Sequence, residues 1–413
     1  MVIEHVILAL VLILGLSLIA QPISRLMRLP LASALVILGY LTSELLVYMG
    51  IDTGIRSDNF QSLIFYVFIP VLVFESAYNI DKQQLRNNLV IILTMSVIAM
   101  LLTSLIVAVL LFYGIAHESG FPWIAALITG AILAATDPVA VVAKLREMNA
   151  PGRISVLLEG ESLFNDATAI VLFGLFLSMA TATSGVAATG DIHLMLDVVV
   201  RFVLIFLGGA LTGLVVGLVS GFIQTRVKQQ FPVAVMSLLV AYGSYLLAEH
   251  FMVSGVMSTL LAALSYSSVL HRDVGNRESE MKDKNFWNVL SHIANVSVFL
   301  IVGVVITLEM FEQRWLAILI AILSLIIARA ISVYGVLLLF SFFKNLKVSF
   351  AAQSVMVWGG LRGAVTLALA LSLPTSLEYW WTIQSIAFGV VMFSLFVQAP
   401  TMQWLVTKLS LKQ

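Results

Sequence analysis

Thirteen long apolar stretches, separated by short polar breaks, constrain the fold of this chain more than any other feature. Each comes near or exceeds the roughly 20 apolar residues that a helix needs to cross about 30 Å of hydrocarbon. Several breaks contain a proline, as at Pro122, Pro151 and Pro374. The predicted spans are 3–23, 31–50, 61–77, 88–114, 122–144, 154–182, 196–223, 231–249, 251–270, 287–308, 314–342, 348–373 and 379–405.

The composition excludes the common classes of soluble protein. Of 413 residues, 61% are apolar and only 11% are Asp, Glu, Lys or Arg, whereas soluble domains carry about a quarter charged residues. The 22 basic residues balance 22 acidic ones, which excludes a nucleic-acid binder, and the chain has no Cys, which excludes a disulfide scaffold. No alternating ten-residue segments of the β-barrel type occur. The sequence therefore predicts an all-α polytopic membrane protein with 13 transmembrane helices.

The basic residues predict which way the spans run. If the N-terminus is outside, 17 of the 22 Lys and Arg residues fall in inner loops. Outer positions then keep only Arg56, Arg201 and Arg314. Because cytoplasmic loops carry an excess of basic residues, we expect the N-terminus outside and the C-terminus in the cytoplasm. The first stretch follows no basic segment and is too long for a cleaved signal peptide, so we expect a retained helix.

A few charged residues lie inside the predicted spans. A charge at the bilayer centre costs at least about 2.5–3.5 kcal/mol, so such residues are expected to be functional. Counted at about 1.5 Å per residue from the nearest break, four of them on four different spans lie near the midplane. These four are Asp137, Asp166, Arg329 and Arg362, and the other charged residues that we single out within spans are Glu75, Glu159 and Glu161.

Two of these spans contain residues that interrupt a helix. Span five has Pro138 directly after Asp137, and its ring disrupts the preceding turn. Span twelve has Gly359, Gly360 and Gly363 around Arg362, which lowers the cost of unwinding. The two spans are seven apart, an odd number, so they run through the membrane in opposite directions. Matching breaks in two such spans predict an inverted repeat. An Asp and an Arg at the breaks suit opposite half-helix charges; two purely structural kinks are the alternative.

Span six combines oxygen-bearing side chains at helical spacing. Glu159, Ser162 and Asp166 fall on one face, whereas Glu161 lies beside Asn165, four residues later. Carboxylate, hydroxyl and amide oxygens at this density suit a hard cation such as Na⁺. A buried carboxylate also binds a proton readily. A single carboxylate that holds either Na⁺ or H⁺ is sufficient for exchange.

The interrupted spans and span six resemble the cation/proton antiporter family, specifically its NhaP and NHE type sodium/proton antiporters. The resemblance covers essentially the whole chain and keeps the motifs in the expected spans and order. It is carried by Ala135-Thr136-Asp137-Pro138, by Gly160-Glu161-Ser162-Leu163-Phe164-Asn165-Asp166 and by Gly359-Gly360-Leu361-Arg362-Gly363.

The resemblance implies a role for each of these side chains. Asp166 would bind Na⁺ and H⁺ alternately, and Asn165 before it marks the electroneutral branch. Arg329 would pair with Glu161, and Arg362 would balance the break in span twelve. The implied Na⁺/H⁺ site comprises Asp166, Asp137, Thr136, Ser162, Glu161 and Asn165, with Asp166, Thr136, Ser162 and Asp137 as metal ligands and with Glu75 and Glu159 in a cytoplasmic funnel.

The family architecture implies crossed, unwound helices 5 and 12 in an inverted-repeat antiporter fold. A transport core would slide against a dimerising scaffold as an elevator, and the partners would be membrane lipid and a second copy of the chain. The location would be the cell (inner) membrane of a prokaryote. The implied units are scaffold 1–85 (helices 1–3), core 86–190 (helices 4–6), linker helix 191–228, scaffold 229–310 (helices 8–10) and core 311–413 (helices 11–13).

The resulting functional prediction is electroneutral exchange of one Na⁺ for one H⁺, with no enzymatic activity and no cofactor apart from the transported ion. Oxygen ligands do not fix cavity size, so exchange of K⁺ or Li⁺ by the same fold is an alternative. An intramembrane aspartyl protease using Asp137 and Asp166 is disfavoured, because neither aspartate lies in a Gly-x-Gly-Asp element. A passive cation channel is also disfavoured, because no repeated carbonyl-rich filter loop occurs.

Overall fold

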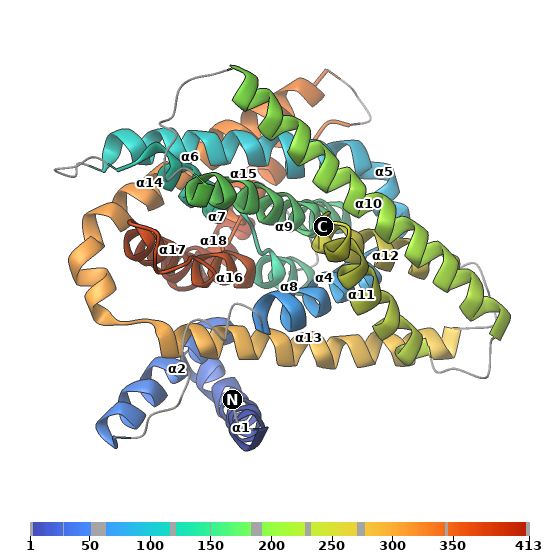
Figure 1. Ribbon diagram of the computed structural model, residues 1–413, viewed down its shortest axis with the longest axis horizontal. Helices are drawn as coiled ribbons and strands as arrows, with labels where there is room; N and C mark the ends of the chain where they lie inside the picture. Colours follow the sequence, from blue (N-terminus) through green and yellow to red (C-terminus); the bar gives the residue numbers. More distant parts are fainter. Residues whose placement is uncertain are drawn as a thin grey trace.

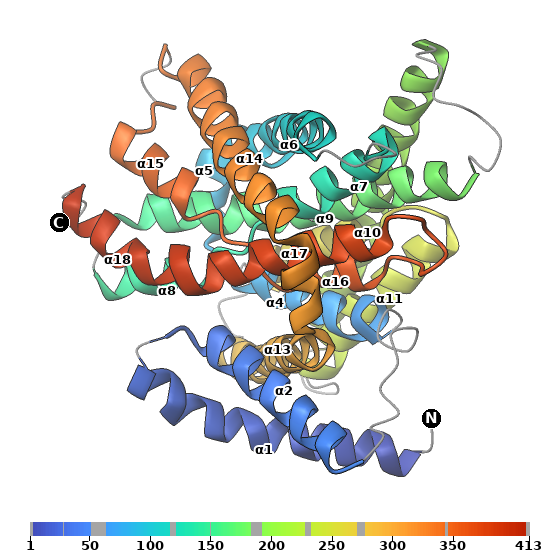
Figure 2. The same ribbon diagram turned by 90° about the vertical axis from the view of Figure 1, so that its left-hand side faces the viewer.

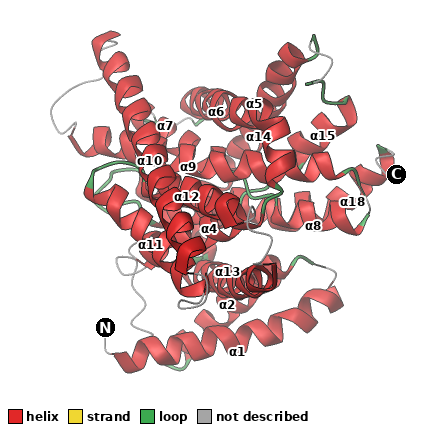
Figure 3. Ribbon diagram, turned by 90° about the vertical axis from the view of Figure 1, so that its right-hand side faces the viewer, coloured by secondary structure: helices red, strands yellow, loops and turns green. Residues whose placement is uncertain are grey.

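The computed structural model describes residues 3–27, 29–50, 63–115, 121–148, 150–182, 192–227, 233–270, 277–342 and 346–409. In these ranges the only regular elements are helices (Figure 3). Arg56, predicted at an outer position, lies outside the described residues. The all-helical fold class is confirmed.

The first half of the chain forms helices up to the long α10, and two of its spans contain short π-helical turns. In order they are α1 (Ile3–Met27), α2 (Leu31–Tyr48), η1 (Ile64–Phe68), α4 (Ile69–Asn79), α5 (Lys82–Leu93), η2 (Thr94–Ala99), α6 (Met100–Gly114), α7 (Trp123–Ala134), α8 (Val139–Glu147), α9 (Gly152–Ala182) and α10 (Ile192–Val227).

The second half continues with helices of similar length. In order they are α11 (Val233–His250), α12 (Gly255–Leu270), α13 (Arg277–Val305), α14 (Leu308–Phe340), α15 (Phe350–Trp358), α16 (Ala364–Leu371), α17 (Trp380–Phe393), η4 (Ser394–Gln398) and α18 (Ala399–Lys408). The backbone of α14 is non-helical at Arg314, so the residues before it form a short connecting segment.

Every predicted span coincides with one helix or with two or three helical elements in sequence. Among the described residues, nine helical segments are long and apolar enough to cross a membrane, and three shorter apolar helices are Val11–Met27, Ile64–Asn79 and Gly255–Leu270. The remaining predicted span is the interrupted pair α15 and α16. The chain is thus a polytopic membrane protein, and the count of 13 crossings stays a prediction.

Polar side chains start two helices at their aqueous ends. The Asp81 carboxylate accepts a hydrogen bond from the backbone N–H of Gln84 at 3.0 Å and begins α5. This backbone hydrogen bond lowers the pKa of Asp81. Ser349 caps α15 in the same way through the N–H of Ala352. Such caps satisfy amides that have no partner within their own helix.

Helix packing divides the molecule into two groups that meet at α9. One group contains α2, α4, α11, α12 and α13, with α1 and α2 lying together on the outer side of α13 (Figures 1 and 2). The other contains α5, α6, α7, α14, α16 and α17, packed around α9. Between the groups, α9 contacts α4 and α12, and α13 contacts α16.

The long α10 belongs with the first group because of its glycines. A Cβ atom on Gly213 would lie 2.7 Å from the Cα of Ser258, and one on Gly217 would lie 2.9 Å from the Cα of Ala262. Both contacts are closer than two carbon atoms tolerate. The glycines therefore let α10 approach the backbone of α12, as small residues do at membrane helix interfaces.

Candidate functional site

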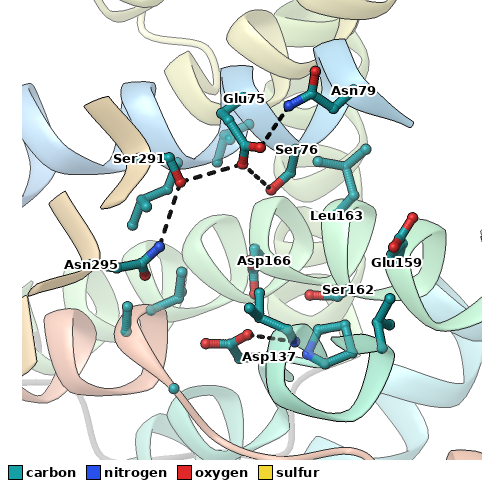
Figure 4. A pocket seen from close by; sticks show the side chains of 18 of the residues that line it. Glu75, Ser76, Asn79, Asp137, Glu159, Ser162, Leu163, Asp166, Ser291 and Asn295 are labelled. Carbon is teal, nitrogen blue, oxygen red and sulfur yellow. Dashed lines mark hydrogen bonds between the residues drawn. The ribbon is translucent and has the colours of Figure 1, made fainter. Parts of the chain in front are cut away.

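A cavity of about 670 Å³, lined by both polar and apolar residues, lies between the two helix groups. Asp166 on α9 lies in its wall near Asp137 and Ser162, and Glu75 faces it from α4 (Figure 4). The cavity is also lined by residues of α8, α13 and α16. The lining therefore brings both interrupted spans and span six to one place.

The face of α9 predicted from helical spacing is the face that lines the cavity. Glu159, Ser162 and Asp166 all contribute to its wall. The Asp166 oxygen Oδ1 is buried and has no hydrogen-bond partner among the described residues. A buried carboxylate oxygen without a donor is costly to keep ionised. An incoming cation or proton would satisfy it.

The first interruption leaves residues 135–138 non-helical between α7 and α8. Ser162 donates from Oγ to the Thr136 carbonyl at 2.6 Å. Asn165 donates to the Ala134 carbonyl and to the Thr136 hydroxyl, each at 3.1 Å. Two side chains of α9 thus satisfy backbone groups that the interrupted helix leaves without an internal partner.

The second interruption leaves residues 359–363 non-helical between α15 and α16 and lies directly against the first. The Asp137 amide donates to the Leu361 carbonyl at 2.8 Å, which joins the two breaks. Gly363 packs on the Asp137 side chain so closely that an added Cβ would lie 2.7 Å from Asp137 Cγ. Only glycine fits there without displacing the aspartate.

Two charged side chains occupy the helix ends where these two breaks meet. The Asp137 carboxylate accepts a hydrogen bond from the Val139 amide at the start of α8, at 3.1 Å. The Arg362 guanidinium donates to the Leu133 carbonyl at 2.8 Å and also to the Gly360 carbonyl. The negative group therefore lies at a helix N-terminus and the positive group at C-terminal carbonyls, the arrangement that helix dipoles favour.

The ion pair predicted between spans six and eleven is present. Arg329 Nη1 lies 2.5 Å from Glu161 Oε1, with the two side chains 3% and 1% exposed. Arg329 also donates to the Met356 carbonyl at 3.3 Å. Both charges are therefore buried and compensated within the second helix group.

Two residues predicted to bind the ion do not line the cavity. Glu161 is directed to Arg329, and Asn165 is directed to the interrupted α7. Helical rotation explains this placement, because residues one position before or after Ser162 and Asp166 point about 100° away from them. The geometry gives Glu161 and Asn165 supporting positions behind Asp166, Asp137, Thr136 and Ser162.

The wall opposite Asp166 is polar and centred on Glu75. Its carboxylate accepts hydrogen bonds from Asn79 at 2.7 Å, from Ser291 at 3.3 Å and from Ser76 at 3.5 Å (Figure 4). These uncharged partners are missed by a search restricted to charges within spans. Ser76 and Ser291 are hydroxyl groups inside predicted spans, but that local signal does not show that they gather around Glu75.

Glu159, predicted in the funnel, lines the cavity and pairs with the exposed Arg146 at 2.5 Å. Among the residues that the structure describes, no three His, Cys, Asp or Glu side chains converge as a metal-binding group. The oxygens available to a cation at Asp166 are those of two carboxylates, a hydroxyl and the Thr136 carbonyl.

Comparison with known proteins gives consistent matches over nearly the full length. Residues 7–408 match the family described as sodium/hydrogen exchanger, transmembrane. The chain is 34% identical over 371 residues to the Na⁺/H⁺ antiporter ApNhaP of Aphanothece halophytica, covering 89% of this chain and 69% of that protein. It is 30% identical to the Na⁺/H⁺ antiporter NhaH of Halobacillus dabanensis, covering 99% of both.

A solved structure shows the same fold. The sodium proton antiporter MjNhaP1 of Methanocaldococcus jannaschii superimposes with a TM-score of 0.78 at 21% identity, covering 99% of this chain and 100% of that one. The arrangement of helices is therefore similar in the two proteins.

Proposed function

The chain belongs to the sodium/hydrogen exchanger family, and from that premise we propose that it exchanges one Na⁺ for one H⁺ at Asp166. It is a Na⁺/H⁺ antiporter and thus a transporter, not an enzyme, so the protease alternative is set aside. The observation that carries the site assignment is the unpartnered Asp166 Oδ1 at the wall of the cavity between the helix groups.

The ion site that we propose consists of oxygens from the cavity wall. Asp166 supplies the exchanging carboxylate, and Ser162, Asp137 and the Thr136 carbonyl complete the ligand set. Such oxygens suit a hard monovalent cation. Na⁺ entry displaces the proton, and proton entry displaces Na⁺, because one carboxylate serves both. Glu161, Asn165, Arg329 and Arg362 act by holding the surrounding helices. We propose no resident cofactor.

The division into two helix groups supports the proposal of alternating access. The proposed core comprises 86–190 and 311–413, and the proposed scaffold comprises 1–85 and 229–310, with 191–228 as linker. Asp166 lies on the core side of the cavity and Glu75 on the scaffold side. A core carrying Na⁺ or H⁺ on Asp166 has one charge fewer to bury than an empty core, so the loaded core moves more readily.

The direction of the cavity follows from the predicted orientation. The exposed Arg146 side chain lines the cavity. The distribution of basic residues assigns Arg146 to the cytoplasmic side. In the proposed topology of 13 spans with crossed helices 5 and 12, the cavity is open to the cytoplasm. We further propose a homodimer in the cell (inner) membrane of a prokaryote, with the N-terminus outside.

The experiment is Na⁺-driven proton flux in proteoliposomes, with Asp166→Asn as the test variant. We expect flux in the wild type and none in Asp166→Asn, while the variant unfolds at a similar temperature. Asp197→Asn is the matched control, because it removes the same charge from the exposed start of α10. Flux retained by Asp166→Asn would contradict the assignment.

The alternative of K⁺ or Li⁺ exchange is tested in the same vesicles. Repeating the measurement with each cation at equal ionic strength ranks them by apparent KM. A lower KM for K⁺ than for Na⁺ would replace the sodium assignment, leaving the role of Asp166 intact.

A further inference from the structure

A second polar cavity, of about 720 Å³, adjoins the one that contains Asp166. Its lining includes Asp81, Lys82 and Gln84 at the start of α5. Five residues line both cavities and therefore form the neck between them: Asn79, Ile80, Arg146, Glu159 and Lys284. An ion that moves from the second cavity to Asp166 passes these residues.

The Arg146–Glu159 ion pair lies in this neck. Arg146 is in the last turn of α8, and Glu159 is on α9, with 2.5 Å between Arg146 Nη2 and Glu159 Oε1. The Arg146 side chain is 68% exposed and that of Glu159 is 26% exposed. The guanidinium can therefore leave the carboxylate for water without entering a buried environment, whereas Glu159 stays directed at the neck.

Glu159 is also electrically close to the ion site. It lies seven residues before Asp166 on the same face of α9, about 10 Å along the helix axis. Glu75 from α4 interacts electrostatically with both Glu159 and Arg146, and Lys284 from α13 lines the same neck. A change of one charge at Glu159 or Arg146 therefore alters the electrostatic potential at Asp166 across a partly aqueous path.

We propose that the Arg146–Glu159 pair is the entry filter for the transported cation. Glu159 is a transient ligand that a monovalent cation contacts on its way to Asp166, and Arg146 occupies that carboxylate between passages. An entering cation replaces the guanidinium, which turns to water, and the guanidinium returns once the cation has moved inward. This inference rests on the proposed Na⁺/H⁺ exchange and adds the residues of its entry path.

The test compares the apparent KM for Na⁺ in Glu159→Gln, Arg146→Gln and the double variant. Glu159→Gln removes the ligand and leaves Arg146 unopposed, so its KM rises about two- to tenfold. Arg146→Gln leaves the carboxylate free for the cation, so its KM falls by a similar factor. The double variant, which restores the net charge of the neck, returns toward the wild-type value. Na⁺-dependent shifts in unfolding temperature provide a second readout.

Glu147→Gln is the matched control, because Glu147 pairs with Lys144 at 2.8 Å on the same helix but lines neither cavity. Its KM is expected to stay at the wild-type value. A merely structural pair predicts that both single variants change KM in the same direction, or not at all, and either result would overturn the proposal. A wild type without Na⁺-driven flux would overturn the proposed function itself, and the entry filter with it.

Discussion

Asp137 and Arg362 neutralise opposite helix ends where the two interrupted spans meet. The Asp137 carboxylate accepts from Val139 at the start of α8 and from Ala364 at the start of α16. Arg362 donates to Leu133 near the end of α7 and to Gly360 just beyond α15. Each helix end carries about half an elementary charge. One carboxylate and one guanidinium therefore compensate four ends that membrane would otherwise leave unsatisfied.

Replacing Arg362 by Gln is predicted to destabilise the contact between the two interrupted spans. The substitution removes charged donors from two buried carbonyls, and each such hydrogen bond contributes about 1.5–3 kcal/mol. We expect a marked fall in the unfolding temperature in detergent and loss of exchange. Arg201→Gln, at an exposed position on α10, is the control. An Arg362→Gln protein as stable as this control would contradict the assigned role.

Replacing one member of the Glu161–Arg329 pair is predicted to lower the stability of the protein more than replacing both. Either Glu161→Gln or Arg329→Gln leaves one buried charge without its partner, which costs about 3–5 kcal/mol. The double variant leaves neither charge and should recover part of this loss. Thermal unfolding of all four proteins gives the coupling energy by a double-mutant cycle. Additive losses would show that the two side chains do not stabilise each other.

The charges and breaks of this site were predictable because membranes make them conspicuous. Asp137, Asp166, Arg329 and Arg362 are costly in apolar spans, and Pro138 and the glycines near Arg362 mark places where a helix is easily interrupted. The spacing along α9 also predicted that Glu159, Ser162 and Asp166 share one wall.

Other features depend on contacts between distant segments and were not predictable from local patterns. The pairing of Glu161 with Arg329 was expected from the family resemblance, but local patterns do not reveal that it turns Glu161 away from the cavity, since that depends on how α9 is rotated against α14. The wall of Asn79 and Ser291 around Glu75 likewise arises only where α4 meets α13. The neck at Arg146 could not be predicted, because it exists only where the two cavities adjoin.

Adding a single methyl group at Gly363 is predicted to impair the ion site. The new Cβ in Gly363→Ala would lie 2.7 Å from Asp137 Cγ, so the aspartate must shift away from the second break. Overpacking of this kind costs about 1–3 kcal/mol. Gly174→Ala on α9 is the control, since nothing lies within 4 Å of its added Cβ. We expect reduced flux and stability in the first variant only; equal behaviour of the two would contradict close packing at Asp137.

Transport is predicted to be insensitive to membrane voltage. One Na⁺ replaces one H⁺ on the Asp166 carboxylate, and the neighbouring Asn165, which has no charge, cannot carry a second proton. Each uncompensated charge would couple transport to the potential by about 2.3 kcal/mol per 100 mV. Net flux in proteoliposomes should therefore be the same with the potential clamped at zero or at −100 mV by K⁺ and valinomycin. A flux that changes severalfold with voltage would exclude one-for-one exchange, and Asn165→Asp would then test whether a second carboxylate alters that dependence.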